Sequence, residues 1–171
     1  MKRIAKFDKV TFEQFKNDFK DCFDYGQGKT DEEIKAIYEA IKLPKRSTKG
    51  SAGYDFVIPV DLVLNPNSNQ KIPTGIRCSI NDNWVLKLYP RSGLGFKYRI
   101  RMNNTVGIID SDYFYSDNEG HIFVKISNEG NKTVKFQAGE KFVQGIFVEY
   151  GITVDDDATG IRNGGFGSTD V

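Results

Sequence analysis

The chain has 171 residues, a formal net charge of +1 and 39% hydrophobic residues. This length predicts one domain with a substantial core, and the near-zero charge excludes a whole-molecule field that would draw the protein to nucleic acid or to a membrane. The longest apolar run is far shorter than a membrane span, and the first ten residues lack the apolar stretch of a signal peptide, so we expect a cytoplasmic protein.

Two amphipathic helices are predicted near the N-terminus. Phenylalanines recur every three to four residues over 11–23, which places them on one helical face behind Thr11 as the N-cap. Three acidic residues open a second helix over 31–41, and Pro44 lies beyond its end. We expect residues 11–41 to form a helical addition that packs against the main body, with a partner-binding surface as the alternative.

From Ser51 onward the hydrophobic period changes from 3.6 to 2, the period of half-buried strands. Strands are expected at 2–7, 54–60, 62–64, 71–80, 84–89, 98–102, 106–109, 122–127, 133–136 and 142–150. Turn residues separate them, a pattern typical of an antiparallel sandwich, jelly roll or barrel. The β core is predicted over 43–150, within a single domain that spans 1–171, and Trp84 is expected in the core.

The character of the chain changes again after Tyr150. Three aspartates at 155–157 precede GIRNGGFGSTDV, which is too polar and too rich in glycine to fold by itself. A disordered tail is one interpretation. Phe166 between glycines, with hydroxyl residues after it, equally suits a flap that closes over a ligand. Residues 151–171 are therefore treated as a C-terminal arm.

The cysteines and the histidine narrow the possible chemistry. Cys22 and Cys78 are widely spaced and follow no metal-binding or redox pattern, so both are predicted to be free thiols. His121 is the single histidine of the sequence, which argues against a histidine-based metal site and against a Ser-His-Asp triad.

A basic stretch and an acidic turn carry the remaining chemistry. The segment 83–109 contains five basic residues and no acidic one. Within it, the glycines of PRSGLG at 90–95 let backbone N–H groups approach an anion, and Ser92 adds a hydroxyl. Asp110 follows a buried apolar run, either as a turn cap or as a mounted catalytic group. The combination suggests that water activated by Asp110 attacks a phosphate ester or anhydride, with Mg²⁺ held chiefly by the phosphates and its own waters.

Five short motifs follow one another along the chain. They are AGYD at 52–55, PRSGLGFK at 90–97, Asn104 with VGIIDSDY at 106–113, GEKFVQ at 139–144, and GGFGST at 164–169. Together they resemble the motifs of the trimeric, all-β dUTP diphosphatase (dUTPase) family, and five in order give a far stronger signal than any one. The resemblance implies a jelly-roll homotrimer with an exchanged C-terminal arm, which hydrolyses dUTP to dUMP and pyrophosphate with Mg²⁺.

The resemblance also implies roles for individual residues. Asp110 would orient the water that attacks the α-phosphorus, Tyr113 would pack on the deoxyribose, and Phe166 would cover the uracil. The uracil edge would be read by Asn104 and the backbone of Gly107, Ile108 and Ile109. The other substrate-binding residues would be Arg91, Ser92, Gly93, Gln144, Arg162, Gly167, Ser168 and Thr169. Asp55 would support the water shell of the metal, which has no direct protein ligand.

The chain departs from the family pattern at several positions. Lys141 stands where an Arg is usual, which predicts a weaker or rearranged salt bridge. Arg162 lies four residues before Phe166 instead of five. The hairpin after Tyr113 is longer, because FYSDNE precedes the next glycine. Asp170 stands near the phosphates where Gly is common.

Two other functions compete with dUTP hydrolysis. dCTP deaminase, a relative of similar fold, needs a Glu as its base on the strand after the third motif, but Lys125 occupies that position. A non-enzymatic nucleotide-sensing module would use the helices at 11–41 as its partner surface. The presence of Asp110, Asn104 and Phe166 argues against an inactive enzyme.

Overall fold

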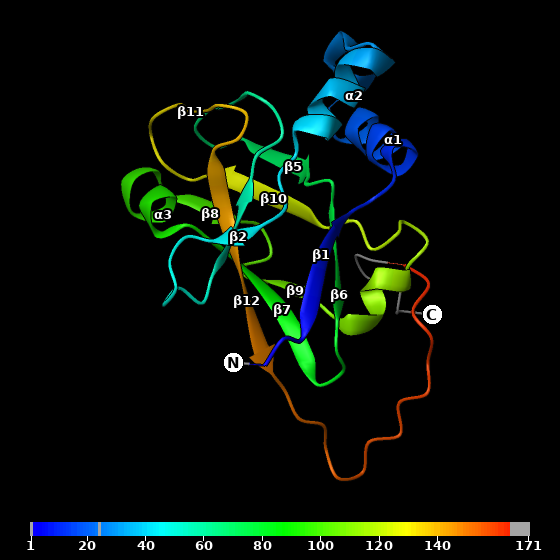
Figure 1. Cartoon of the computed structure of the whole chain (residues 1–171). Coiled ribbons are helices and arrows are strands. Elements are labelled where there is room, and N and C mark those ends of the chain that lie inside the picture. Colours follow the sequence, from blue (N-terminus) through cyan, green and yellow to red (C-terminus); the bar gives the residue numbers. More distant parts are fainter. Residues whose placement is uncertain (1, 24, 165–171) are drawn as a thin grey trace.

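The computed structural model describes residues 2–23 and 25–164, and their fold is mainly β (Figure 1). The predicted mainly β, jelly-roll class is confirmed, with antiparallel pairing in the sheets. The strands are β1 (Ala5–Lys9), β2 (Lys45–Arg46), β3 (Tyr54–Val57), β4 (Leu62–Leu64), β5 (Asn69–Pro73), β6 (Ile76–Ile80), β7 (Trp84–Pro90), β8 (Ile100–Met102), β9 (Gly107–Ile109), β10 (Phe123–Asn128), β11 (Val134–Phe136) and β12 (Lys141–Glu149). The helices are α1 (Phe12–Cys22), η1 (Tyr25–Gly28), α2 (Asp31–Ala40), α3 (Ser92–Tyr98) and η2 (Ser111–Tyr115).

The largest sheet positions the candidate site. Its strand order is β2-β3-β12-β7-β9, and β12 pairs with β3 on one side and with β7 on the other. A second sheet has the order β5-β10-β8, while β1-β6 and β11-β4 form two-stranded ladders. Asp110 leaves the large sheet at the end of β9, and Arg91 leaves it at the end of β7.

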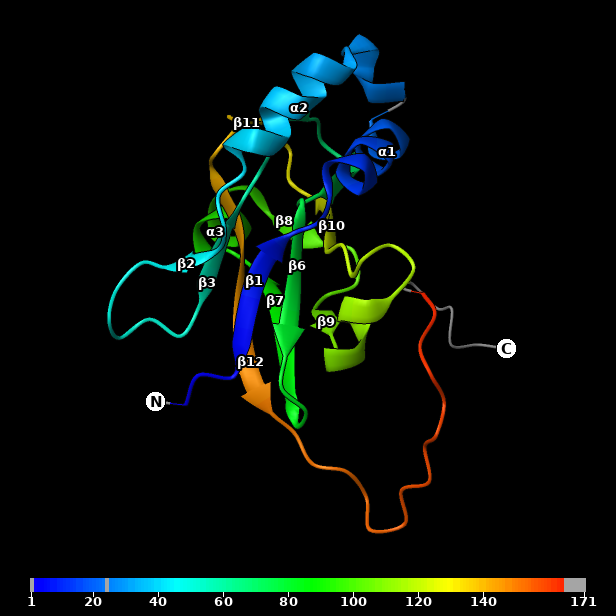
Figure 2. The same cartoon turned by 45° about the vertical axis from the view of Figure 1, so that its right-hand side comes forward.

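The helices α1 and α2 bury their apolar faces in the same core as the strands. Phe15 and Phe19 of α1 and Ile34 of α2 are fully buried in the hydrophobic cluster that contains the strand residues. Each such side chain contributes roughly 1.5–3 kcal/mol when it leaves water. Thr11 caps α1 as predicted, because its hydroxyl accepts a hydrogen bond from the amide of Gln14. Figures 1 and 2 show both helices at one end of the β structure.

The strand β1 joins the beginning of the chain to the β structure. It pairs with β6 from Ala5 to Lys9, close to the strand expected at 2–7. Phe7 of β1 lies against Tyr54, Phe56 and Phe147 of the large sheet, with ring centroids 5.4, 5.6 and 5.8 Å apart. The helices at 11–41 therefore lie between two parts of the β structure in sequence.

Some predicted strands have the wrong extent. Residues 71–80 form β5 and β6 rather than one strand, because Gly75 between them has a left-handed φ of 72°. The strand that begins at Tyr54 ends at Val57 instead of continuing to residue 60. Trp84, which was expected in the core, is half-buried at the beginning of β7 and packs against the core from outside.

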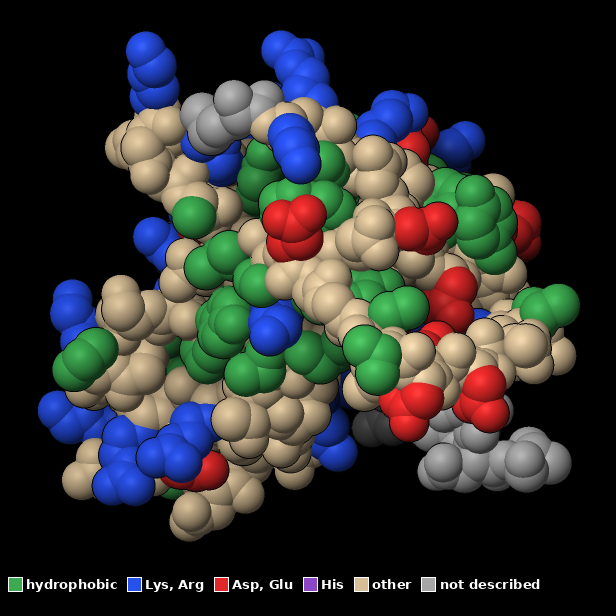
Figure 3. Space-filling model, turned by 90° about the horizontal axis from the view of Figure 1, so that it is seen from below, with side chains coloured by type: hydrophobic (Ala, Val, Ile, Leu, Met, Phe, Trp, Pro, Cys, Tyr) green, Lys and Arg blue, Asp and Glu red, His purple; other side chains and the backbone are tan. Residues whose placement is uncertain are grey.

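Hydrophobic, basic and acidic side chains occupy different parts of one face of the molecule (Figure 3). Seen from below, hydrophobic side chains gather in the middle of the face, basic ones project mainly at its upper and left margins, and acidic ones lie mostly to the right (Figure 3).

Cys22 and Cys78 are free, as predicted. Burial raises the pKa of Cys22 to about 11 and that of Cys78 to about 12, so both thiols stay protonated at neutral pH.

Across residues 2–23 and 25–164, the helices are too short or too polar for any of them to cross a lipid bilayer.

Candidate active site

Asp110 lies where β9 leaves the large sheet and η2 begins. The apolar run before Asp110 is a strand as predicted, but it is buried on one face only: Gly107 and Ile109 face the core, whereas Ile108 between them is 53% exposed. Asp110 stands at the N-cap of η2, but no hydrogen bond links its side chain to the first turn within the described residues. The turn-cap interpretation therefore does not account for this carboxylate, which is 42% exposed.

A pocket of about 240 Å³ opens beside β9 and η2. It is lined by Asn104, Val106, Gly107, Ile108, Ile109, Tyr113, Phe123 and Arg162. The structure thus brings together the residues predicted to read the base and to contact the sugar, and it adds Phe123 from β10. The hairpin before β9 is tight, since the amide of Val106 donates to the carbonyl of Asn104 at 2.6 Å.

Tyr113 is held rigidly in the wall of this pocket. Its side chain is buried, and its hydroxyl donates to the His121 carbonyl at 2.6 Å and accepts from Asn118 Nδ2 at 2.8 Å. Burial raises the pKa of the Tyr113 phenol, and the charge of Asp18 adds to the rise, so the hydroxyl remains protonated. Because the hydroxyl already has a donor and an acceptor, the ring is what Tyr113 offers to a ligand.

A second polar cluster forms around Asp55 of β3. Lys141 Nζ lies 2.7 Å from Asp55 Oδ2, Ser47 Oγ donates to the same oxygen at 2.7 Å, and Arg91 Nε lies 3.5 Å from Oδ1. Burial by itself raises the pKa of Asp55, but the hydrogen bonds from Lys141 and Ser47 and the charge of Arg91 outweigh it, so the pKa is lowered. Lys141, at the usual Arg position, therefore forms an ion pair with Asp55. Ser47 was not predicted, because an isolated serine in a loop carries no sequence signal.

Gln144 reaches the same cluster from β12, where it lies opposite Asp55 on one side and Tyr89 on the other. A Cβ atom on Gly53 would lie 2.5 Å from Gln144 Oε1, so the glycine of the first motif leaves room for this amide. The first, second and fourth motifs thus meet at one end of the large sheet.

The segment PRSGLG, predicted to approach an anion through its backbone, runs from the last residue of β7 into a short helix. Residues Ser92–Tyr98 form α3, and the expected strand at 98–102 begins only at Ile100 because Arg99, with a φ of 56°, ends the helix. Ser92 and Gly93 are exposed in the first turn of α3, next to Arg91. A Cβ on Gly93 would meet no described atom within 4 Å, so the surface there is open.

The two clusters lie at opposite ends of the sheet within one protomer. Asp110 follows Ile109, which pairs with Leu86 of β7, whereas Arg91 follows Pro90 at the end of β7. Four residues along a strand span roughly 14 Å. Figures 1 and 2 show α3 on one side of the molecule and the yellow-green helix η2 on the other. A single phosphate group cannot touch Asp110 and Arg91 of the same protomer.

The C-terminal arm returns to its own chain (orange to red in Figures 1 and 2). Arg162 donates from Nη2 to Asp110 Oδ2 at 2.7 Å and from Nε to Asp112 Oδ1 at 2.9 Å. Arg162 was expected at the phosphates, but here it lies on these two carboxylates, and the role of Asp112 was missed although it belongs to the acidic turn. The remaining predicted residues of the arm, Phe166, Gly167, Ser168 and Thr169, lie outside the described residues.

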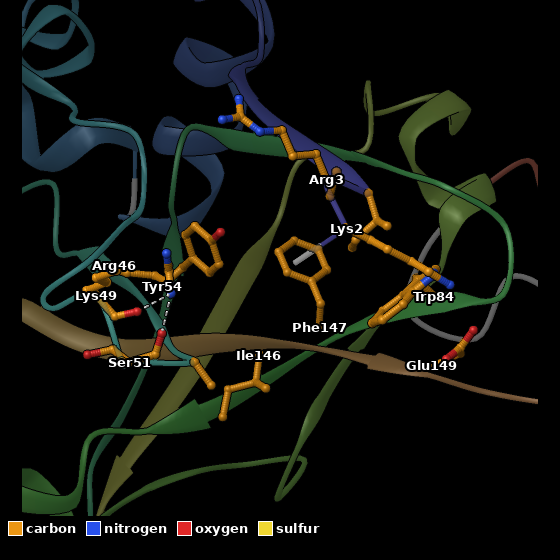
Figure 4. Close-up of a pocket in the computed structure, with 14 residues that line it drawn as sticks. Lys2, Arg3, Arg46, Lys49, Ser51, Tyr54, Trp84, Ile146, Phe147 and Glu149 are labelled. Atoms are coloured by element: carbon orange, nitrogen blue, oxygen red, sulfur yellow. Dashed lines mark hydrogen bonds between the residues drawn. The ribbon is translucent and has the colours of Figure 1, made fainter.

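A larger, open pocket of about 960 Å³ lies away from both clusters. Figure 4 shows Phe147 and Trp84 within it, with Lys2 and Arg3 above them from the N-terminal segment. Arg46 at its edge donates to the carbonyls of Lys49 and Ser51 at 3.1 and 2.9 Å. None of the residues predicted for the site lines this pocket, so it is not part of the candidate active site.

Comparison with known sequences gives one consistent family. A family model described as dUTPase matches residues 39–170. The deoxyuridine 5′-triphosphate nucleotidohydrolase of Lactococcus lactis subsp. lactis is 39% identical over 132 residues, which cover 75% of this chain and 88% of that protein. The enzyme of the same name from Tolumonas auensis is 40% identical over 135 residues, which cover 74% of this chain and 86% of that protein.

Comparison with solved structures agrees. The dUTPase from Streptococcus mutans is 36% identical, with a TM-score of 0.61, and the match covers 67% of this chain and 89% of that one. A mutant dUTPase from phage phi11 of S. aureus, whose structure is described as revealing the coordination of a structural Mg(II) ion, shares the fold at 21% identity and a TM-score of 0.58, with 70% of this chain and 90% of that one covered.

Proposed function

The chain belongs to the dUTPase family, and from that premise we propose how its residues hydrolyse dUTP to dUMP and pyrophosphate. The observation that carries the proposal is the position of Asp110: a partly exposed carboxylate at the end of a buried strand, beside a pocket of about 240 Å³. The reaction removes dUTP from the precursors of DNA and supplies dUMP for dTMP synthesis. We place it in the cytoplasm.

The pocket beside β9 takes the deoxyuridine. Backbone groups of 107–109 and the exposed Asn104 face the uracil edge, where the donor and acceptor pattern differs from that of cytosine. The Tyr113 ring packs on the deoxyribose and leaves no space for a 2′-hydroxyl. The tight hairpin before β9 supports the selection of uracil, because the pocket wall that it forms would collide with the methyl group of thymine.

Asp110 orients one water molecule toward the α-phosphorus. As the water oxygen bonds to the phosphorus, the bond to the bridging oxygen between the α- and β-phosphates breaks and pyrophosphate leaves. The proton of the water passes to the Asp110 carboxylate, which acts as general base. Arg162 occupies Asp110 Oδ2 in this conformation, so Arg162 must leave that oxygen before it can accept the water proton.

The phosphates lie at the second cluster, against Arg91, Ser92, Gly93 and Gln144. The described residues contain no group of three or more His, Cys, Asp or Glu side chains that could hold a metal ion. The oxygens of Asp55 already face Lys141, Ser47 and Arg91. These residues fit a Mg²⁺ ion that substrate phosphates and water would hold and that would neutralise phosphate charge when bound. Asp55 would then order Arg91 and Lys141 beside the phosphates.

We propose a homotrimer in which the two clusters of one protomer serve two different active sites. The separation of roughly 14 Å between them supports this arrangement, because Asp110 and Arg91 must approach the same triphosphate. An exposed Ile108 and half-buried Ile146 and Val148 on the large sheet provide apolar surface for a neighbouring copy. The arm would then exchange between protomers.

A pyrophosphate-release screen over all dNTPs tests the substrate. We expect release from dUTP alone, with dUMP as the second product, and comparable release from the other nucleotides would contradict the proposal. The same screen covers the deaminase alternative: Lys125 is exposed on β10 in place of the required Glu, so dCTP should yield no uracil nucleotide.

A mixing experiment tests the shared site. Asp110→Asn and Arg91→Ala variants should each be inactive alone, and refolding them together at equal amounts should restore about a quarter of the wild-type activity, because that fraction of sites then combines two intact contributions. If one protomer supplied both residues to one site, the mixture would stay inactive.

A further inference from the structure

His121 is fully buried, and both of its ring nitrogens have partners. Nε2 accepts the N–H of Gly75 at 2.8 Å, so the ring hydrogen lies on Nδ1. Nδ1 donates to Asp18 Oδ2 at 2.5 Å. The backbone carbonyl of the same histidine accepts the hydroxyl of Tyr113 at 2.6 Å. His121 therefore connects Asp18, in the N-terminal helix α1, to Tyr113 in the wall of the candidate base pocket.

Aromatic rings of β10 and of α1 pack beside the His121 ring and hold it in place. The His121 ring lies 4.4 Å from the Phe123 ring and 6.2 Å from the Phe15 ring of α1. A Cβ on Gly75 would lie 3.3 Å from Phe15 Cδ2, so the glycine lets α1 approach closely enough for Asp18 to reach His121. The Asp18 side chain is 15% exposed, which protects its hydrogen bond from competition with water.

A second tie joins α1 to the hairpin that follows Tyr113. The backbone N–H and the hydroxyl of Thr11 donate to the two carboxylate oxygens of Glu119, each at 2.7 Å. Glu119 and Gly120 both have left-handed φ values, 59° and 69°. A Cβ on Gly120 would lie 2.7 Å from Phe114 Cα and from the Tyr113 carbonyl oxygen, so this turn packs closely against the backbone beside Tyr113.

We propose that the helical segment 11–41 positions Tyr113 through these two ties, and that Asp18 is thereby a specificity-determining positioning residue. The inference deepens the proposed function and rests on it, since it assumes that Tyr113 meets the sugar. The helices precede the five motifs, and the longer hairpin after Tyr113 departs from the family pattern. The helical segment 11–41 and the longer hairpin are in contact through Thr11 and Glu119. Both set the orientation of the Tyr113 ring, which leaves no space for a 2′-hydroxyl.

Substitution of Asp18 tests the proposal. Asp18→Ala removes the acceptor for His121, whereas Asp18→Asn keeps an oxygen in place. We expect Asp18→Ala to lower the ratio of kcat/KM for dUTP to that for UTP about tenfold, the scale of one lost hydrogen bond. The change should come mainly through a higher KM for dUTP, and Asp18→Asn should restore most of the ratio. Lys20→Ala, on the same helix as Asp18, removes an exposed ion pair with Asp31 of α2 and should leave the ratio unchanged.

Hydrogen exchange supplies a readout that is independent of turnover. In Asp18→Ala, amides of residues 113–121 should exchange faster than in wild type, and in Lys20→Ala they should not. If Asp18→Ala fails to fold, Glu119→Ala in the partly exposed hairpin replaces it as the test variant. It should likewise lower the dUTP/UTP ratio and speed the amide exchange of residues 113–121. A folded variant with lower thermal stability but an unchanged dUTP/UTP ratio and unchanged exchange would overturn the inference. If wild type itself fails to hydrolyse dUTP, the proposed function is wrong. The exchange experiment would still test whether the contacts of Asp18 and Glu119 order residues 113–121.

Discussion

At the scale of single residues, the proposed mechanism gives the chemical step to the partly exposed carboxylate of Asp110 and the selection of the sugar to the buried ring of Tyr113. Asp110 directly follows Ile109, the buried last residue of β9. The strand therefore fixes the backbone of Asp110, while its side chain remains accessible. Tyr113 has no free hydrogen-bonding capacity, so it contributes shape. This division predicts different kinetic effects for changes at the two positions.

Asp110→Asn should lower turnover of dUTP by about 10²–10⁴-fold and leave dUTP affinity nearly unchanged, because the amide can hold water but cannot take its proton. Pyrophosphate release gives the turnover, and calorimetry with a non-hydrolysable dUTP analogue gives the affinity. Asp112→Asn is the matched control, since Asp112 shares Arg162 with Asp110 but lies two residues further along, within η2. Undiminished turnover in Asp110→Asn would remove this residue from the mechanism.

Lys141→Met should reduce thermal stability in a pH-dependent way. The pKa of Asp55 is lowered in the folded protein, so its ion pair contributes stability that is present above the unfolded pKa of about 3.9 and is lost as the pH falls through the lower folded value. The Tm difference from wild type should therefore be present at pH 7 and shrink below about pH 4. Lys135→Met, at an exposed position of β11, is the control. A Tm difference that persists at low pH would show that the loss arises from packing.

At the scale of elements, the N-terminal helices are part of the core and not an independent appendage. Phe19 is fully buried against the β structure, and its ring centroid lies 5.7 Å from that of Phe15 and 4.8 Å from that of Phe23. The element α3 shows the opposite situation, because its side chains are exposed or half-buried and local hydrogen bonding decides its form.

Phe19→Ala should cost about 3–5 kcal/mol of unfolding free energy, since it leaves a cavity in a close-packed cluster. Lys20→Ala, next to it on the partly exposed side of α1, should cost little because exposed ion pairs contribute about 0–1 kcal/mol. Chemical denaturation at fixed protein concentration measures both. A loss below about 1 kcal/mol in Phe19→Ala would mean that α1 can detach while the β structure stays folded.

At the scale of the whole molecule, the chain presents two separate polar clusters and an arm that folds back on one of them. Arg162 pairs with both Asp110 and Asp112 in this conformation, and the carbonyl of Asn163 accepts a hydrogen bond from the amide of Asp117 at 3.3 Å. Residues 151–161 are exposed, so the described part of the arm is attached to the body mainly at Arg162 and Asn163. Exchange of the arm with another protomer would require little loss of packing.

Deletion of residues 160–171 should therefore abolish most turnover and leave the Tm within a few degrees of the wild-type value, because none of the described residues 160–164 is buried. Calorimetry and pyrophosphate release measure the two quantities on the same preparation. Loss of folding would indicate a structural role for the arm, and full activity would show that the arm is dispensable.

The sequence by itself determined the features that neighbouring residues encode. The strand period before Asp110, the Thr11 cap of α1 and the order of the five motifs depend on spacings within short segments, and they predicted the mainly β class and the family. The segment between the strands expected at 84–89 and 98–102 was less determined, because its glycines are compatible with a loop and with a short helix, and the structure forms the helix Ser92–Tyr98.

Only the tertiary structure decided which distant residues meet. Lys141 joins Ser47 and Asp55, and Asp18 reaches His121 across a separation of 103 residues. It also decided that Asp110 and Arg91 lie apart in one protomer. These relations depend on strand register and on how closely α1 packs, and both are set by the burial of side chains throughout the core, which no local spacing records.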